Sequence, residues 1–213
     1  PATYFDELEM RNDIVLLLST LGDTPWFKMT QRHSDRIWLF ARADARPSKP
    51  LLPDDPSPAR QFRLVDLVLL HHGGERQVTS TAEWMDAAEA TRVFHWNQMD
   101  ENDARRLSRT MSGKSVGLVL SGGGARAYAH IGVMRALREA NCPVDFIGGA
   151  SMGAIVGAAI ACGWDDEEIH RRIYQAFVET NPLSDYRLPV VGLVKGHKVD
   201  ARLKEHFGDR LIE

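Results

Sequence analysis

The chain has 213 residues, of which 44% are hydrophobic and 26% charged, and its formal net charge is −3. This composition is typical of a folded globular protein and excludes a disordered tail or a collagen-like fibre. The near-neutral charge gives no electrostatic reason to bind nucleic acid, so no nucleic-acid partner is expected. The only cysteines are Cys142 and Cys162. Two cysteines exclude a disulfide framework, fit no metal-ligand spacing and favour a reducing compartment.

No segment with the pattern of a signal peptide or a membrane span is expected. The chain starts at Pro1, and no charged segment near the start leads into an apolar one. Residues 146–164 are uncharged and approach the length that spans a bilayer. Their glycine and alanine content makes transfer to lipid weak, and four acidic residues follow at once.

In the first half of the chain, short apolar runs alternate with polar residues. This pattern predicts strands over residues 14–18, 37–40, 64–70 and 93–96, with a helix that starts at Thr24 and Pro25. Clustered prolines predict an exposed loop over residues 46–60. A polar helix over residues 101–111 ends at Gly113. We place a domain boundary there, between an accessory α/β region (1–112) and a second domain (113–213).

The second half reads as strand, helix, strand over residues 116–120, 125–140 and 144–148, which predicts a parallel crossover. Further helices are predicted over residues 154–162, from residue 165 onward, and through Leu203 and Phe207. The apolar positions of two helices recur at helical spacing and are expected to be buried. They are Ala129, Val133, Ala136 and Leu137 in one helix and Ile169, Ile173, Ala176 and Phe177 in the other.

The strongest chemical signal is Gly149-x-Ser151-x-Gly153 between a predicted strand and a predicted helix, the context of a nucleophile elbow. Such a sharp turn leaves no room for side chains beside the serine, so glycine is needed on both sides. The turn lifts the Ser151 hydroxyl above the sheet edge, where a substrate carbonyl can reach it. The alternative is that these glycines only let the helix and strand pack closely.

A second signal is Gly122-Gly123-Gly124, also between a strand and a helix. Backbone N–H groups there can form an oxyanion hole for acyl transfer, or they can hold phosphate. Gly122-x-Gly124-x-x-Ala127 also fits the dinucleotide fingerprint, which expects an acidic residue at the end of the second strand. The nearby acid, Asp145, lies at the start of that strand instead. The pair of motifs favours acyl transfer over a nucleotide- or phosphate-binding module with a structural Ser151.

These residues resemble the patatin-like phospholipases, including the bacterial relatives of neuropathy target esterase. The loop Gly122-Gly123-Gly124-Ala125-Arg126 precedes Ser151 by the interval seen in that family, and residues 124–133 look much like its bacterial members. The region with Thr24-Pro25-Trp26 and residues 67–71 is more loosely similar to the region before the catalytic domain of neuropathy target esterase.

The resemblance implies the first half of a three-layer, parallel-sheet α/β hydrolase domain. It further implies a serine hydrolase of phospholipid or lysophospholipid esters that uses a Ser–Asp dyad without a catalytic histidine. Ser151 would match the nucleophile, and Gly122, Gly123 and Gly124 the oxyanion hole. Arg126, Gly149 and Gly153 would support these motifs.

The resemblance also bears on the catalytic base, cofactors and location. The sequence has no Asp-Gly dipeptide, so the aspartate is expected beyond Glu213, and this fragment alone should have little or no activity. No cofactor or metal is expected. The expected setting is cytoplasmic, with peripheral membrane contact in the full-length protein.

Four histidines are further candidates for a catalytic or metal-binding role. His130 follows the glycine loop, either as a triad histidine or as a helix residue with a satisfied ring. His71, His72 and His95 have no partner at metal-ligand spacing and are predicted to be surface or turn residues.

Overall fold

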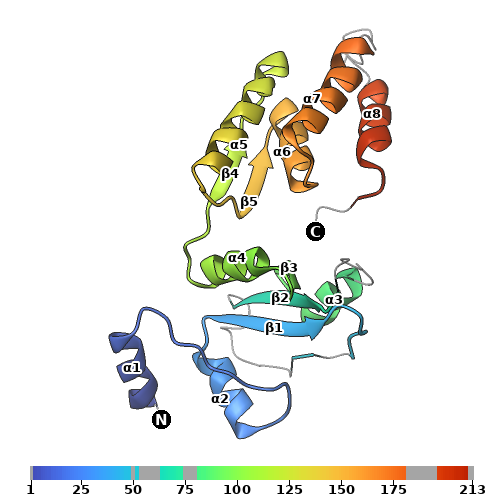
Figure 1. The fold of residues 1–213 in the computed structure, drawn as a ribbon. Helices are drawn as coiled ribbons and strands as arrows, with labels where there is room; N and C mark the ends of the chain where they lie inside the picture. Colours follow the sequence, from blue (N-terminus) through green and yellow to red (C-terminus); the bar gives the residue numbers. More distant parts are fainter. Residues whose placement is uncertain (1, 49–50, 53–62, 74–80, 181–195, 211–213) are drawn as a thin grey trace, which may run out of the picture. The chain divides into compact units, whose positions relative to one another are not determined.

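The computed structural model describes residues 2–48, 51–52, 63–73, 81–180 and 196–210 (Figure 1). They divide into two compact units, Pro1–Lys114 (unit 1) and Ser115–Ile212 (unit 2). Each unit contains a sheet of parallel strands with helices packed on it. The chain is therefore an α/β protein, as the sequence predicts. Most of the proline-rich loop predicted over residues 46–60 lies outside the described residues.

Unit 1 is built on a three-stranded parallel sheet of order β1-β2-β3. Its elements are α1 (Ala2–Arg11), α2 (Pro25–His33), β1 (Arg36–Arg42), β2 (Leu64–His71), α3 (Thr81–Ala88), β3 (Arg92–Asn97) and α4 (Glu101–Met111). Thr24 caps α2 by accepting a hydrogen bond from the Phe27 N–H (3.1 Å), and Pro25 takes the first helical position. The predicted helix start is confirmed.

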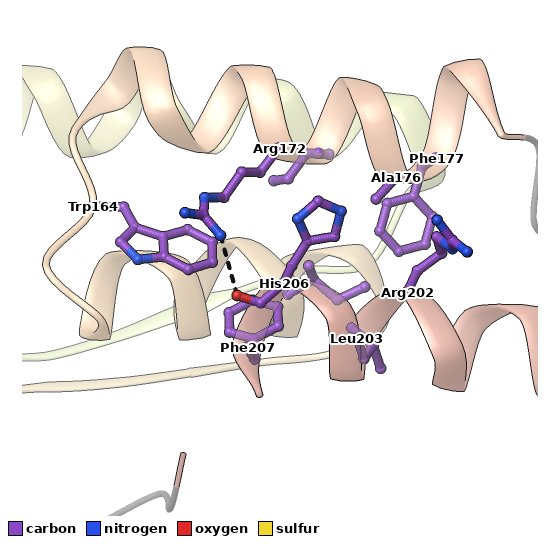
Figure 2. Close-up of a pocket in the computed structure, with 10 residues that line it drawn as sticks. Trp164, Arg172, Ala176, Phe177, Arg202, Leu203, His206 and Phe207 are labelled. Atoms are coloured by element: carbon purple, nitrogen blue, oxygen red, sulfur yellow. Dashed lines mark hydrogen bonds between the residues drawn. The ribbon is translucent and has the colours of Figure 1, made fainter. Parts of the chain in front are cut away.

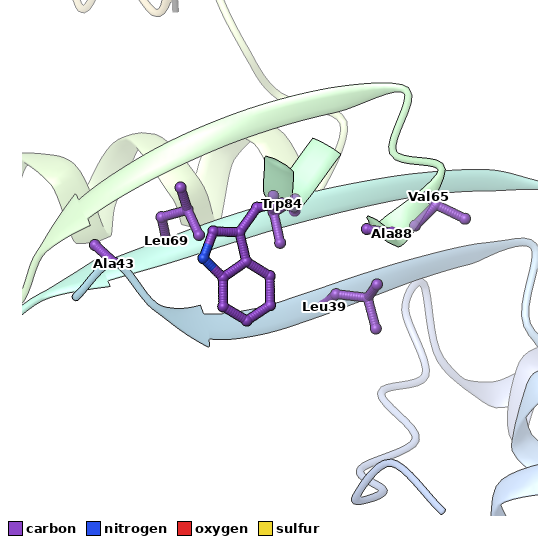
Figure 3. Close-up of a cluster of buried hydrophobic side chains, with 7 residues drawn as sticks. Leu39, Ala43, Val65, Leu69, Trp84 and Ala88 are labelled. Carbon is purple, nitrogen blue, oxygen red and sulfur yellow. The ribbon is translucent and has the colours of Figure 1, made fainter. Parts of the chain in front are cut away.

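Helices cover both faces of the unit 1 sheet. Alternate residues of a strand point to opposite faces, so each strand contributes side chains to both helix contacts. On one face Val65 and Leu69 of β2 lie in one buried cluster with Trp84 and Ala88 of α3 (Figure 3). On the other, Val68 and Phe94 pack with Leu107 of α4. Unit 1 is therefore a three-layer arrangement with a separate core on each side of its sheet.

A buried carboxylate links the three strands near their amino ends. The Asp66 side chain on β2 is 0% exposed. It accepts two hydrogen bonds from Arg92 of β3, each 2.9 Å, and forms an ion pair with Arg36 of β1 at 3.1 Å. Both arginine side chains are about one-third exposed, and their guanidinium groups lie over aromatic rings of their own strands. The cluster joins all three strands through one side chain.

Residues 14–18 are not in a strand, so that prediction is wrong. Ile14, Leu16 and Leu18 are 47%, 66% and 87% exposed. A strand needs a hydrogen-bonded neighbour, and none of the described strands pairs with this run. The segment is tied down instead through its backbone, since the Trp26 indole N–H donates to the Leu18 carbonyl (2.9 Å).

The prediction that His71 and His95 are surface or turn residues is also wrong. They are 4% and 9% exposed at the carboxyl ends of β2 and β3, and His71 Nε2 lies 2.8 Å from His95 Nδ1. The parallel register pairs Leu69 with His95, which brings two histidines far apart in sequence side by side. His72, one residue beyond β2, is exposed.

Unit 2 contains a two-stranded parallel sheet of β4 (Gly117–Leu120) and β5 (Phe146–Gly149). Its helices are α5 (Ala129–Glu139), α6 (Met152–Ala161), α7 (Asp166–Tyr174) and α8 (His197–Phe207). A 3₁₀ turn, Gly124–Tyr128, precedes α5, and a π-helical turn, Gln175–Glu179, extends α7. The predicted parallel crossover is confirmed.

The core of unit 2 lies on one face of this sheet. Leu120 of β4, Val156 and Ala159 of α6, and Ile169 and Ile173 of α7 are buried together. Val119 and Phe146 on the other face are 82% and 38% exposed.

The prediction for α7 is confirmed, but the predicted face of α5 is wrong. Ala129, Val133 and Ala136 are exposed, whereas Ile131 is buried. The reason is that α5 packs through Ile131 against α6 and α7.

The uncharged stretch of residues 146–164 is divided between β5 and the ten-residue helix α6. Within the described ranges, none of the helices combines the length and the apolar character needed to cross a membrane.

Candidate active site

Two sequence motifs meet at the carboxyl edge of the unit 2 sheet. β4 and β5 pair in register with Leu120 opposite Gly149, and the Ala150 N–H continues the ladder to the Leu120 carbonyl (3.0 Å). The glycine bend (Gly122, Gly123 and Gly124) follows β4, and the serine turn (residues 149–153) follows β5. Parallel pairing therefore delivers both segments to one edge.

Ser151 lies at the apex of the serine turn with φ 52° and ψ −128°, angles that residues with a side chain rarely adopt. It is the N-cap residue of α6, and its carbonyl accepts the Ala154 N–H (2.9 Å). Its side chain is exposed and makes no hydrogen bond to any other described residue. The hydroxyl is therefore accessible from solvent.

The two glycines of the serine turn occupy positions where a side chain does not fit. A Cβ on Gly149 would lie 2.6 Å from the Gly153 carbonyl carbon and 2.7 Å from the Ala154 nitrogen. A Cβ on Gly153 would collide with the carbonyl oxygens of Leu120 and Ser121. These contacts are with backbone, which cannot move aside cheaply, so glycine is required at both positions.

The glycine bend lies directly against the serine turn. A Cβ on Gly122 would be 3.2 Å from both Ser151 Cβ and the Ala150 carbonyl oxygen. Gly124 has φ +56°, which favours glycine. The N–H groups of the three glycines donate no hydrogen bond to any other described residue. The bend therefore offers backbone donors beside the exposed hydroxyl.

Arg126 lies beside the bend, in the 3₁₀ turn. Its backbone N–H donates to the Gly123 carbonyl (3.2 Å), and its Nε would be 3.6 Å from a Cβ on Gly123. The side chain is exposed.

The sequence does not predict the contact that His130 makes at this edge, and it does not identify the Met152 N–H as a site component. His130 Nε2 lies 2.9 Å from the carbonyl oxygen of Ser121, the residue between β4 and the bend. The Met152 N–H is in the first turn of α6, where backbone donors have no acceptor within the helix. The Met152 donor belongs to the backbone, so the identity of the Met152 side chain does not predict it. The His130 contact depends on how the 3₁₀ turn leads into α5, which sequence periodicity does not reveal.

Asp145 lies at the opposite end of β5 from the serine turn. Its carboxylate accepts the Val116 N–H (2.9 Å), and its own N–H donates to the Val116 carbonyl (2.8 Å). It is 7% exposed and ties the start of β5 to the residue before β4. This carboxylate is not at the strand end where a dinucleotide fold holds its ribose.

A concavity lies between α6, α7 and α8, with about 240 Å³ of empty space that includes open solvent (Figure 2). Its walls include Ile155, Phe177 and Phe207, and the Arg172 guanidinium lies 4.3 Å from the Trp164 ring. Burial lowers the pKa of His206, and the neighbouring arginines act in the same direction. Neither Ser151 nor the glycine bend lines this concavity.

Across the described ranges, no group of three or more His, Cys, Asp or Glu side chains is placed to hold a metal ion.

Comparison with known proteins identifies related sequences. Residues 118–213 match the family model described as patatin-like phospholipase. An uncharacterized NTE family protein of Mycobacterium tuberculosis is 42% identical over 107 residues, covering 50% of this chain and 18% of the relative. Lysophospholipase NTE1 of Kluyveromyces lactis is 40% identical over 117 residues, covering 53% of this chain and 8% of the relative. Patatin-like phospholipase domain-containing protein 6 of Homo sapiens is 29% identical over 234 residues, covering 94% of this chain and 17% of the relative. The chain thus spans only a small part of these relatives, and no solved structure matches it.

Proposed function

Residues 118–213 belong to the patatin-like phospholipase family, and from this premise we propose that the protein hydrolyses acyl esters of phospholipids or lysophospholipids with Ser151 as nucleophile. The substrate class is supported by the similarity to a protein named lysophospholipase. In this proposal unit 2 carries the hydrolase chemistry, and unit 1 is an accessory region.

One observation carries the proposal. The exposed Ser151 hydroxyl, on a strained turn, adjoins a bend whose backbone N–H groups donate to no other described residue. An ester whose carbonyl carbon is attacked by Ser151 Oγ develops negative charge on its carbonyl oxygen. Donors held beside the nucleophile stabilise that charge, and removal of one such donor typically costs about 3 kcal/mol of transition-state stabilisation.

The proposed reaction has two stages. Ser151 Oγ attacks the ester carbonyl carbon while its proton passes to a carboxylate, which we propose is an aspartate in the sequence after Glu213. The N–H groups of Gly122, Gly123, Gly124 and Met152 receive the oxyanion. Collapse of the tetrahedral intermediate breaks the ester C–O bond, and the departing oxygen takes the proton from the carboxylic acid and leaves as the alcohol, so that Ser151 stays acylated. The regenerated carboxylate then deprotonates a water that attacks the acyl carbon, and collapse of this second intermediate releases the fatty acid and returns the proton to Ser151 Oγ.

The roles assigned to the remaining groups follow from this reaction. Gly149 and Gly153 form the turn, Arg126 supports the bend, and neither cofactor nor metal takes part.

Because the substrates reside in membranes, we propose peripheral contact of the full-length protein with a lipid surface, in the cytoplasm. The 213-residue chain alone, without the proposed aspartate, should hydrolyse esters slowly or not at all.

A fluorophosphonate probe applied to the full-length protein tests the proposal, because it phosphonylates activated serines. We expect labelling on Ser151 and release of fatty acid from lysophosphatidylcholine. Both should be lost in Ser151→Ala and kept in Ser108→Ala, which changes an exposed serine of α4.

Two outcomes would count against the proposed function. Absence of labelling together with saturable nucleotide binding would favour the phosphate-binding alternative with a structural Ser151. Hydrolysis that survives Ser151→Ala would show that another group is the nucleophile.

A further inference from the structure

His130 makes a specific contact with the backbone just before the glycine bend. It lies in the first turn of α5, and its half-buried ring places Nε2 2.9 Å from the Ser121 carbonyl oxygen. A carbonyl oxygen can only accept a hydrogen bond, so Nε2 carries the proton and donates it. This leaves Nε2 unable to accept a proton from Ser151, as a triad histidine would have to do.

The Ser121 carbonyl and the Gly122 N–H belong to the same peptide group. That group is planar and trans, so its C=O and N–H point in opposite directions. A hydrogen bond that fixes the carbonyl therefore also fixes the direction of the N–H. Gly122 is the residue of the bend in closest contact with Ser151, as its 3.2 Å Cβ approach shows.

The same carbonyl is held from a second side. A Cβ on Gly153, in the first turn of α6, would collide with the Ser121 oxygen, so this oxygen packs directly on the helix that starts at Ser151. The peptide between Ser121 and Gly122 is thus held between His130 of α5 and the backbone of α6. Loss of the His130 contact would leave that peptide held on the α6 side alone.

We propose that His130 is a positioning residue for ester hydrolysis, which aims the Gly122 N–H at the reacting carbonyl oxygen through the Ser121 peptide. The proposal rests on the proposed function. It assigns His130 no contact with substrate and no proton transfer. Its effect should therefore appear in the chemical step and not in substrate binding.

Variants at His130 of the full-length protein separate this role from others. Gln places an amide nitrogen as many bonds from Cα as His Nε2, so His130→Gln can still donate to the Ser121 carbonyl. His130→Asn keeps the amide but is one bond too short, and His130→Ala removes the donor. Glu139→Ala, at the exposed end of the same helix, is the matched control.

Hydrolysis of a soluble short-chain ester and the rate of fluorophosphonate labelling are measured for each variant, with thermal unfolding to confirm folding. In His130→Ala and His130→Asn we expect kcat and the labelling rate to fall about 100-fold, the loss typical of an ångström-scale misplacement, while KM stays close to that of the wild type. His130→Gln should recover most of both rates, and Glu139→Ala should match the wild type. If His130→Ala does not fold, the comparison of Gln with Asn decides.

Three results would overturn the proposal while leaving the proposed function intact. They are an unchanged kcat in His130→Ala and His130→Asn, a loss confined to KM, and a His130→Gln variant as slow as His130→Ala. Activity lost in all three His130 variants as completely as in Ser151→Ala would assign His130 to proton transfer instead. A wild-type protein that neither labels at Ser151 nor hydrolyses the ester would refute the proposed function itself, and this inference with it.

Discussion

Ser151 has a backbone conformation that costs about 1–3 kcal/mol for a residue with a side chain. Such strain persists only where the surroundings fix it. Here the surroundings are the Leu120 carbonyl, which accepts the Ala150 N–H, and the close backbone packing around Gly149 and Gly153. The strain and the tight glycines belong to one local arrangement that leaves the hydroxyl exposed.

Two glycines of the same helix give a matched pair of substitutions. Gly153→Ala should lower the free energy of unfolding by about 3 kcal/mol, since the new Cβ meets backbone oxygens that must shift. Gly157→Ala should raise it by about 0.5–1 kcal/mol, because alanine favours the helix and its Cβ would make an ordinary 3.5 Å contact with Ile147. Urea unfolding of the full-length variants measures both. Equal effects of the two substitutions would contradict the geometry described for the serine turn.

At the scale of single residues, sequence patterns predict the turn at Ser151 but not the burial of His71 and His95. The spacing around Ser151 identifies its turn, because glycine on both sides of a serine reflects a local steric demand. The burial of His71 and His95 is set by the parallel register of β2 and β3, a relation between distant residues. Local patterns carry no information on that register, so they do not reveal the pair.

Among the elements of unit 1, the three strands are linked to one another through the side chain of Asp66. Its carboxylate is fully buried and serves β1 and β3 at once, through Arg36 and Arg92. Asp44, by contrast, forms an exposed pair with Arg42 within one stretch of chain, and such pairs contribute little.

Removing the Asp66 carboxylate should therefore destabilise unit 1 strongly. We expect Asp66→Ala to lower the free energy of unfolding by about 3 kcal/mol, because two arginines lose a buried partner but can turn partly to water. Asp44→Ala should leave stability unchanged within measurement. Chemical denaturation compares the two. A small effect of Asp66→Ala would show that the arginines are satisfied by solvent.

Secondary structure is predictable where it depends on local chemistry. The capped start of α2 and the buried face of α7 follow from residue types at fixed spacing. The run of residues 14–18 has the composition of a strand, but whether a strand forms depends on a partner elsewhere in the chain. The face of α5 that is buried depends likewise on where α6 and α7 pack.

For the molecule as a whole, the two units differ in how completely they bury their sheets. Unit 1 has a core on each face, whereas the described residues of unit 2 leave Val119 82% exposed. Residues 1–114 expressed alone should therefore unfold cooperatively, and residues 115–213 alone should be less stable. Thermal unfolding followed by circular dichroism tests this order. A more stable 115–213 fragment would contradict it.

The pairing of Leu120 with Gly149 has a consequence for how this site tolerates change in its sequence. The distance between Ser151 and the glycine bend is fixed by hydrogen bonds across two strands and not by the length of the chain that connects β4 to β5. A slip of one residue along the ladder would displace the two segments by about 3.3 Å and turn every strand side chain to the wrong face. Insertions near the end of α5 can lengthen the crossover without such a slip. The structure therefore predicts that added residues are tolerated in that connection, whereas an added residue within β4 or β5 is not.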